Sequence, residues 1–68
     1  MTASEIAEVV VRTRRAKGWS QRRLAAHIDV SHSYISHIEA GRRMPSLETL
    51  NLIAQALGLR LTLEQAGP

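Results

Sequence analysis

The sequence predicts a small all-α domain of four or five short helices, followed by one short β-strand at the C-terminus. Apolar residues recur every three or four positions along most of the chain, which is the period of an amphipathic helix. Glycines followed closely by serines divide this pattern into short segments. Near the C-terminus the period changes to two, as in a strand with one buried face. A length of 68 residues allows one domain with a small core.

The first two helices are delimited by capping residues. The first is expected to begin at Ser4, where acidic side chains follow, and to end at Gly18 after a basic last turn. Ser20 is a good N-cap for a second, shorter helix over about 20–28.

The third and fourth helices follow the same logic. Asp29 tolerates the left-handed backbone of a tight turn, and Ser31 can cap a third helix over about 31–40. Ser46 is expected to start a fourth helix, which Gly58 ends. The expected core of the last three helices comprises Leu24, Ala25, Ile28, Val30, Ile35, Ile38, Leu47, Leu50, Ile53 and Leu57.

Residues 59–64 alternate apolar and polar, which predicts a strand with Leu59, Leu61 and Leu63 on one face. A lone strand leaves backbone groups unpaired, so it is expected to pair with the same strand of a second copy and to form a homodimer. The alternative is a continuing helix, because Leu59 and Leu63 are also four positions apart. Residues 65–68 are then a short tail.

The charge distribution favours a polyanionic partner. Nine Lys and Arg stand against six Asp and Glu, with a net charge of +3. No acid interrupts residues 12–23, and a further basic pair follows at Arg42 and Arg43. A charge run of this kind can also be a solvated helix face. One Trp, one Tyr and no Phe argue against single-strand binding by aromatic stacking.

Other function classes have little support in the sequence. The absence of cysteine excludes disulfides, thiolate metal sites and cysteine nucleophiles. His27, His32 and His37 are five positions apart and do not share a helix face, so no metal is expected. No residues suited to catalysis or to a cofactor stand out, and neither an enzyme nor a cofactor is expected. With neither a membrane span nor a leader peptide evident, a cytoplasmic protein is expected.

Two short helices joined by a tight turn match a helix-turn-helix. The strings GWSQxxLA (18–25), VSxSYISxIExG (30–41), PSLxTL (45–50) and IAxALG (53–58) resemble the Cro/C1-type (XRE) helix-turn-helix family. The tail over 57–64 is similar to the HipB-like antitoxin branch of that family. The resemblance implies a lambda-repressor-like DNA-binding domain over residues 1–58 and a dimerisation strand over 59–64.

The resemblance also assigns residues to DNA. The third helix is expected in the major groove, with base contacts from Ser31, His32, Ser33, Ser36 and His37. His32 is the best candidate, although an ordinary exposed histidine is the alternative. Phosphate contacts are expected from Gln21, Arg22, Arg23, Tyr34, Arg42 and Arg43, of which Arg43 could instead reach a minor groove.

Two further expectations concern the fold of this family. Arg14 and Glu39 stand where the family has a basic and an acidic partner, which implies a partly buried ion pair beneath the third helix. Asp29 departs from the family pattern, which has glycine at the tight turn, and this puts the tilt between the second and third helices in doubt.

The implied function is sequence-specific binding of double-stranded DNA by a homodimer that represses transcription from a palindromic operator. The tail suggests the antitoxin of a toxin–antitoxin pair, with a HipA-like kinase toxin as partner. Alternatives are a phage or plasmid repressor or a restriction–modification controller. A protein-interaction module that does not read DNA is an alternative of another class.

Overall fold

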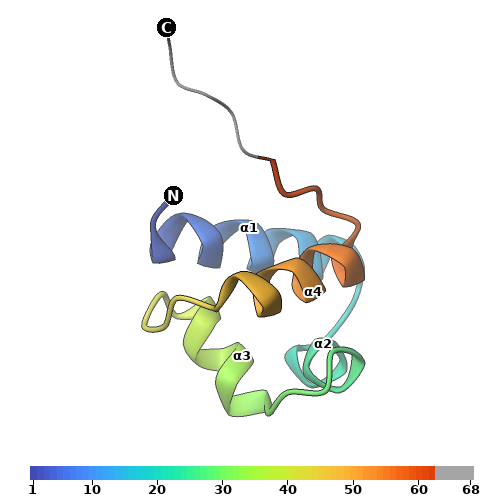
Figure 1. Cartoon of the computed structure of the whole chain (residues 1–68). Coiled ribbons are helices and arrows are strands. Elements are labelled where there is room, and N and C mark those ends of the chain that lie inside the picture. Colours follow the sequence, from blue (N-terminus) through green and yellow to red (C-terminus); the bar gives the residue numbers. More distant parts are fainter. Residues whose placement is uncertain (63–68) are drawn as a thin grey trace, which may run out of the picture.

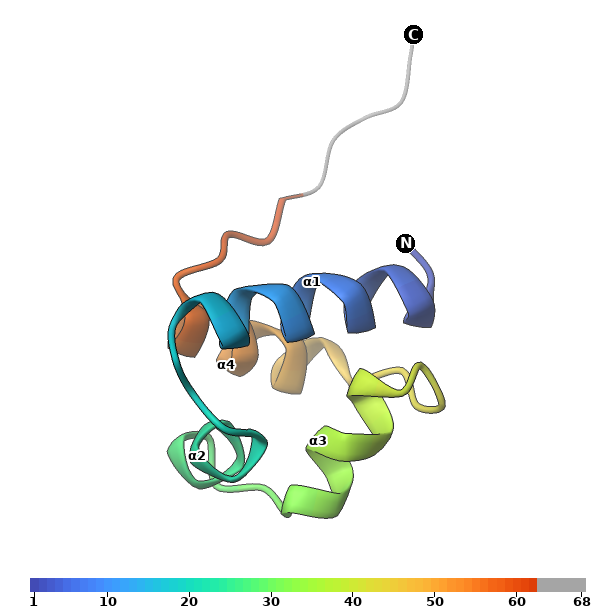
Figure 2. The same ribbon diagram turned by 180° about the vertical axis from the view of Figure 1, so that it is seen from behind.

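The computed structural model describes residues 1–62 as four helices with no strand among them (Figure 1). The helices are α1 (Ala3–Ala16), α2 (Gln21–His27), α3 (His32–Glu39) and α4 (Leu47–Leu57). Helices α1 and α4 lie side by side, and α2 and α3 lie together on the other side of the domain (Figures 1 and 2). The predicted all-α class and helix order are confirmed.

Each helix begins at a hydroxyl side chain that accepts a hydrogen bond from the backbone three residues later. Ser20, Ser31 and Ser46 cap α2, α3 and α4 in this way. The start predicted for the first helix was wrong, because α1 begins one residue earlier and is capped by Thr2. Thr2 and Glu5 form a capping box, in which each side chain accepts from the other residue's backbone N–H.

The turn between α2 and α3 requires a left-handed residue, and Asp29 supplies it with φ 59°. The backbone N–H of Asp29 donates to Ala26 and that of Val30 donates to Ala25, which is the Schellman arrangement. Among the described residues, Asp29 is the only non-glycine with positive φ. The geometry expected of a glycine is therefore reached by aspartate, at some cost in backbone energy.

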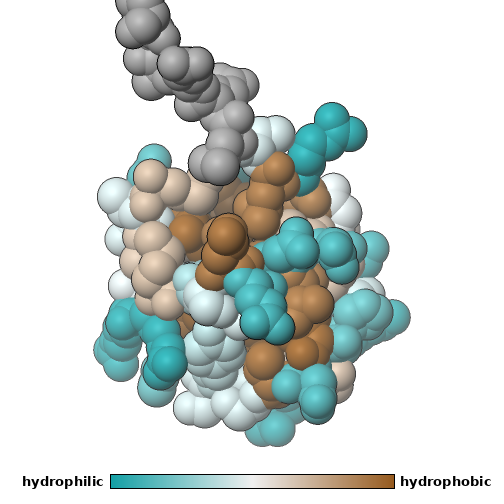
Figure 3. All heavy atoms as spheres, viewed as in Figure 1, coloured by the Kyte–Doolittle hydropathy of each residue, from teal (hydrophilic) through white to brown (hydrophobic). Residues whose placement is uncertain are grey.

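The core lies between the four helices and is entirely aliphatic in its most buried part. Leu24, Ile35, Ile38 and Ile53 are fully buried. Val30 and Leu50, also expected in the core, are partly buried against it. Leu47 was wrongly assigned to the core, because this first residue of α4 is 77% exposed. Figure 3 shows apolar side chains open to solvent over the face of α4, where Leu52 is also exposed.

The chain after α4 does not form the predicted strand within residues 59–62. Leu59 packs against the core and Leu61 is 39% exposed. Leu63 and the rest of the predicted strand and tail lie outside the described residues. Residues 59–62 run along the α1 and α4 side of the domain, away from α2 and α3 (Figures 1 and 2).

Candidate nucleic-acid interface

Helices α2 and α3 are locked together by the turn at Asp29 and by small, buried Ala25. Inward-facing Ile35 and Ile38 anchor α3, and each has no exposed surface. With these two isoleucines and the Glu39 carboxylate directed inward, the opposite side of this eight-residue helix faces solvent. The local sequence therefore fixes which face of α3 is outward.

The outward face of α3 carries short polar side chains. Ser31, Ser33 and His37 are exposed, and His32 and Ser36 are half-buried. Together these are the five predicted base-contact residues. All five can donate or accept hydrogen bonds, as reading a base edge requires.

A groove of about 430 Å³ runs along this face. Its lining unites three predicted base-contact residues with two predicted phosphate-contact residues, Tyr34 and Arg43. The guanidinium of Arg43 lies over the Tyr34 ring, 5.0 Å from its centroid. The ring thus holds a cation at the edge of the polar face.

The ring of Trp19, just before α2, is likewise in contact with cationic side chains. The guanidinium of Arg23 lies 4.6 Å from the ring centroid of Trp19, and the ammonium of Lys17 lies 5.2 Å from it. His27 packs at 5.0 Å against the same ring. Trp19 was given no role of its own from the sequence, although a single tryptophan within a basic stretch is a signal for cation–π contacts.

Below the polar face, side chains from three helices form one hydrogen-bonded chain. Arg14 donates to both oxygens of Glu39, at 2.6 and 2.8 Å, and to the carbonyl of Trp19 at 2.7 Å. Nε2 of Gln21 donates to Oε1 of Glu39 at 2.9 Å. Oε1 of Gln21 lies 3.0 Å from Nε2 of His32. The residue expected to contact phosphate therefore also links the ion pair to the best candidate for base contact.

The ion pair is well shielded, with the Arg14 and Glu39 side chains 8% and 4% exposed. Burial opposes the negative charge of Glu39, but hydrogen bonds from Arg14 and Gln21 outweigh it and lower the pKa of the carboxyl. The charge of Arg15 acts in the same direction. The hydrogen bond to Glu39 in turn raises the pKa of Arg14. Both groups are therefore charged at neutral pH.

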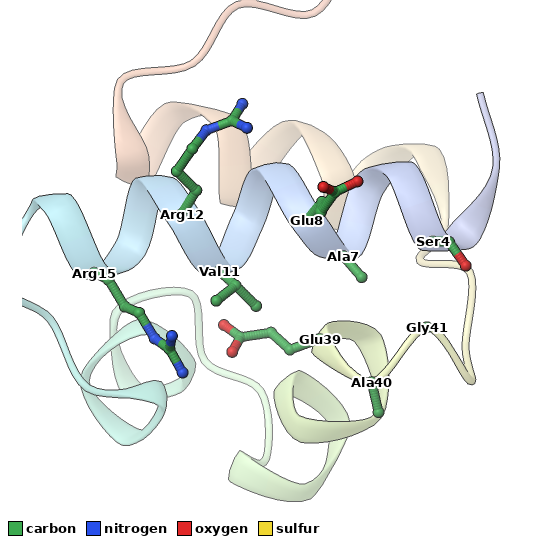
Figure 4. Close-up of a pocket in the computed structure, with 9 residues that line it drawn as sticks. All are labelled: Ser4, Ala7, Glu8, Val11, Arg12, Arg15, Glu39, Ala40 and Gly41. Carbon is green, nitrogen blue, oxygen red and sulfur yellow. The ribbon is translucent and has the colours of Figure 1, made fainter.

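A second groove, of about 630 Å³, lies between α1 and the end of α3. The Glu39 carboxylate reaches into it, and Arg15 extends across toward this carboxylate (Figure 4). Arg12 and Glu8 line the same groove from α1. This groove is thus lined by charged side chains and lies next to the ion pair.

The two remaining predicted phosphate-contact residues, Arg22 and Arg42, are exposed, and their side chains make no hydrogen bond or ion pair among residues 1–62. Within the same residues, no group of His, Cys, Asp or Glu is arranged to hold a metal ion. None of the described helices has the length and apolarity to cross a membrane.

The sequence profile of the helix-turn-helix family matches residues 11–63. Among curated relatives, the chain is 46% identical over 48 residues to an uncharacterized HTH-type transcriptional regulator, y4dJ, of Sinorhizobium fredii, covering 71% of this chain and 62% of that protein. It is 30% identical over 66 residues to multiprotein-bridging factor 1 of Schizosaccharomyces pombe, covering 97% of this chain and 45% of that one. The chain thus spans about half the length of these curated relatives.

Two solved structures extend the comparison. A complex of a HipB variant with an O2 20mer superposes with a TM-score of 0.82 at 30% identity, covering 98% of this chain and 93% of that chain. The restriction–modification controller protein C.Esp1396I, as a tetramer with its natural 35 base-pair operator, gives 0.78 at 31% identity, covering 85% and 76%. The profile match, the curated regulator and these two folds lead to one conclusion: the chain belongs to the Cro/C1-type (XRE) helix-turn-helix family of DNA-binding transcription regulators.

Proposed function

We propose that this protein binds double-stranded DNA sequence-specifically as a homodimer, and that it represses transcription as a HipB-like antitoxin acting on its own operon. The observation that carries the proposal is the outward face of α3, where five polar side chains lie above an aliphatic anchor. We place its action in the cytoplasm, with the DNA that it regulates.

The separation of charge from polarity supports DNA reading. Helix α3 contains no Lys or Arg, whereas basic side chains flank it in α2 and in the loop after α3. Backbone phosphates need positive charge and base edges need directional hydrogen bonds. In this protein, Arg23 and Arg43 would hold the phosphates while α3 lies in the major groove.

The antitoxin role is supported by the overall match to HipB. That comparison covers nearly all of both chains, whereas the curated relatives are longer than this one. The resemblance of residues 57–64 to the HipB-like branch adds to it. The partner expected from this branch is a HipA-like kinase toxin.

Dimerisation is supported by the chain itself. The sequence over 59–64 alternates as a strand does, residues 1–62 contain no strand with which it could pair, and Leu61 leaves an apolar side chain exposed. A two-fold dimer would place two copies of α3 about 34 Å apart, one turn of B-DNA. The operator is therefore expected to be a palindrome.

The test is selection of bound sequences from a pool of random duplexes, followed by titration of the best site at several salt concentrations. The expected result is a palindromic motif and a log–log salt slope of about −5 or steeper. Enrichment of no motif, together with a slope near zero, would remove the DNA-binding proposal. The antitoxin part is tested by co-purification of the protein with a HipA-like kinase. In that complex, release of the operator or inhibition of the kinase is expected.

Two other functions have specific support. The controller protein with its operator has the same fold at 31% identity, which favours a restriction–modification controller as the second candidate. The match to a protein named multiprotein-bridging factor supports a protein-interaction module. A motif found upstream of a methyltransferase gene would favour the controller, and tight protein partners with no DNA motif would favour the interaction module.

A further inference from the structure

We propose that Gln21 is a positioning residue that holds His32 in the tautomer with the proton on Nε2, so that Nδ1 reads a base with an exocyclic amino group, adenine or cytosine. The base-reading part rests on the proposed DNA binding. The tautomer part concerns the free protein and stands apart from it.

The contact with Glu39 determines the orientation of the Gln21 amide. A carboxylate can only accept hydrogen bonds, and the Glu39 oxygens are held in place by two bonds from Arg14. The atom of Gln21 that faces Oε1 of Glu39 at 2.9 Å is therefore the amide nitrogen. The side chain cannot turn over without placing two oxygens against each other.

The contact with Gln21 then determines which ring nitrogen of His32 carries the proton. With the nitrogen of Gln21 directed to Glu39, its Oε1 faces Nε2 of His32 at 3.0 Å. An amide oxygen can only accept, so Nε2 must carry the hydrogen. The negative charge at Glu39 thus selects the histidine tautomer through one intervening amide.

Nδ1 of His32 is then the ring nitrogen left to contact DNA. In a neutral imidazole with the proton on Nε2, Nδ1 is an acceptor. Nδ1 of His32 has no hydrogen bond among residues 1–62, and no fully buried side-chain nitrogen in that part of the chain lacks a partner, so Nδ1 is not fully buried. In the major groove only adenine N6 and cytosine N4 offer hydrogen-bond donors. Guanine and thymine offer acceptors, which would repel the Nδ1 lone pair.

The first test uses the free protein. Long-range ¹H–¹⁵N spectra at pH 8, where an ordinary imidazole is neutral, report which ring nitrogen is protonated. In the wild type, His32 is expected wholly in the Nε2–H form, and in Gln21→Ala its two ¹⁵N shifts should move toward each other as both tautomers become populated. His27 and His37, which have no hydrogen bond to either ring nitrogen in the described residues, should not change.

Either of two results would overturn the tautomer part: a protonated Nδ1 in the wild type, or ¹⁵N shifts of His32 that are the same in Gln21→Ala as in the wild type. Thermal unfolding of the variant establishes that it is folded under the conditions of the spectra.

The second test reads the base at pH 8. Selection from random duplexes should give one preferred base pair at a position of each half-site, and the adenine or cytosine of that pair is the selected base. His32→Ala should abolish that preference while His37→Ala keeps it. Replacing the selected base by its analogue without the amino group, purine or 2-pyrimidinone, should weaken wild-type binding on the order of tenfold. The same replacement should leave His32→Ala unaffected. Wild-type affinity that is unchanged when that amino group is removed would overturn the base-reading part.

The Gln21→Ala variant separates positioning from simple affinity. Loss of a phosphate contact weakens all duplexes alike, whereas loss of tautomer control lowers the preference for the selected base pair relative to the other three. Glu39→Gln should lower the same preference, because the new amide can donate as well as accept and no longer fixes Gln21. An unchanged preference in both folded variants would refute the positioning role. If no duplex is bound at all, the proposed function fails and the spectra alone decide the tautomer.

Discussion

The guanidinium of Arg14 and the carboxylate of Glu39 share two hydrogen bonds across 25 positions of sequence, and so join α1 to the last turn of α3. Three of the helices depend on this contact, because Arg14 also holds the carbonyl of Trp19 and Glu39 also holds Gln21 at the start of α2. The pair fixes the base of the candidate DNA-binding face.

Arg14→Met should destabilise the domain by about 3 kcal/mol, because it leaves the shielded Glu39 carboxylate without its cation. Urea unfolding followed by circular dichroism measures the loss. The double variant Arg14→Met/Glu39→Leu should recover most of it, since neither charge is then stranded. A single variant as stable as the wild type would mean that water solvates the carboxylate in the groove above it.

Acid should remove the contribution of Glu39. Its pKa is lowered in the folded state, so the stabilisation is present in full above the ordinary glutamate pKa of about 4.3 and is lost as the pH falls through the lower folded value. The difference in unfolding free energy between wild type and Glu39→Gln should be largest near pH 6 and should shrink below pH 4. Glu5, whose pKa is lowered by its hydrogen bonds with Thr2, titrates equally in both proteins and cancels. A difference that is constant from pH 7 to pH 3 would contradict this account.

Asp29→Gly should stabilise the protein by about 0.5–1 kcal/mol, because glycine adopts the left-handed backbone at φ 59° without strain. For a domain of this size that raises the melting temperature by about 2–8 °C. Asp29→Ala is the control, and it should lower the melting temperature because alanine gains no relief at this φ and loses a polar side chain suited to the turn. A lower melting temperature for Asp29→Gly would show that the carboxylate itself stabilises the turn.

Arg23→Ala should weaken binding to every duplex by a similar factor and reduce the salt slope by about 1, as expected for one lost phosphate contact. The single tryptophan of the chain lies under the Arg23 guanidinium, so its fluorescence should change on DNA binding in the wild type and change less in the variant. Arg60→Ala is a matched control, since residues 59–62 run on the opposite side of the domain from α2 and α3. Loss of preference for one base in Arg23→Ala would assign this arginine to base reading.

Leu61→Glu should convert a dimer into a monomer, since it places a charge on the apolar face of the predicted pairing strand. Native mass spectrometry should give twice 7.5 kDa for the wild type and 7.5 kDa for the variant. Met44→Glu, at a half-exposed residue in the loop between α3 and α4, should remain a dimer. A wild-type monomer at micromolar concentration would remove both the dimer and the palindrome.

The helices could be predicted well from the sequence because local capping residues determine where they begin, as Ser20, Ser31 and Ser46 illustrate. The start of α1 was misplaced although the signal was present: Thr2 has a glutamate three residues later, whereas Ser4 has alanine there. Leu47 fits the apolar spacing, but its side chain at the very start of α4 is exposed, whereas Leu50 packs against the core. Hydrophobic periodicity identifies the apolar face of a helix, but it does not show which residues of that face have a packing partner.

The linkage from Glu39 through Gln21 to His32 could not be found in the sequence in the same way. These side chains come from two helices, and Arg14 adds a third, so no spacing rule connects them. Each was a candidate for some role on its own, whereas their contact depends on how α2 and α3 cross. The turn at Asp29 sets that crossing, and only the folded chain shows where it places the Gln21 amide.

The positions proposed to contact DNA differ in how freely they could be exchanged. The Ser33 and His37 side chains are exposed and make no hydrogen bond among residues 1–62, so exchanging them is expected to change the preferred operator at little cost in stability. His32 is tied to the interior, and a new residue there must also suit Gln21 and the ion pair. Relatives of this protein that read different operators should therefore vary first at positions 33 and 37, and change position 32 only together with position 21.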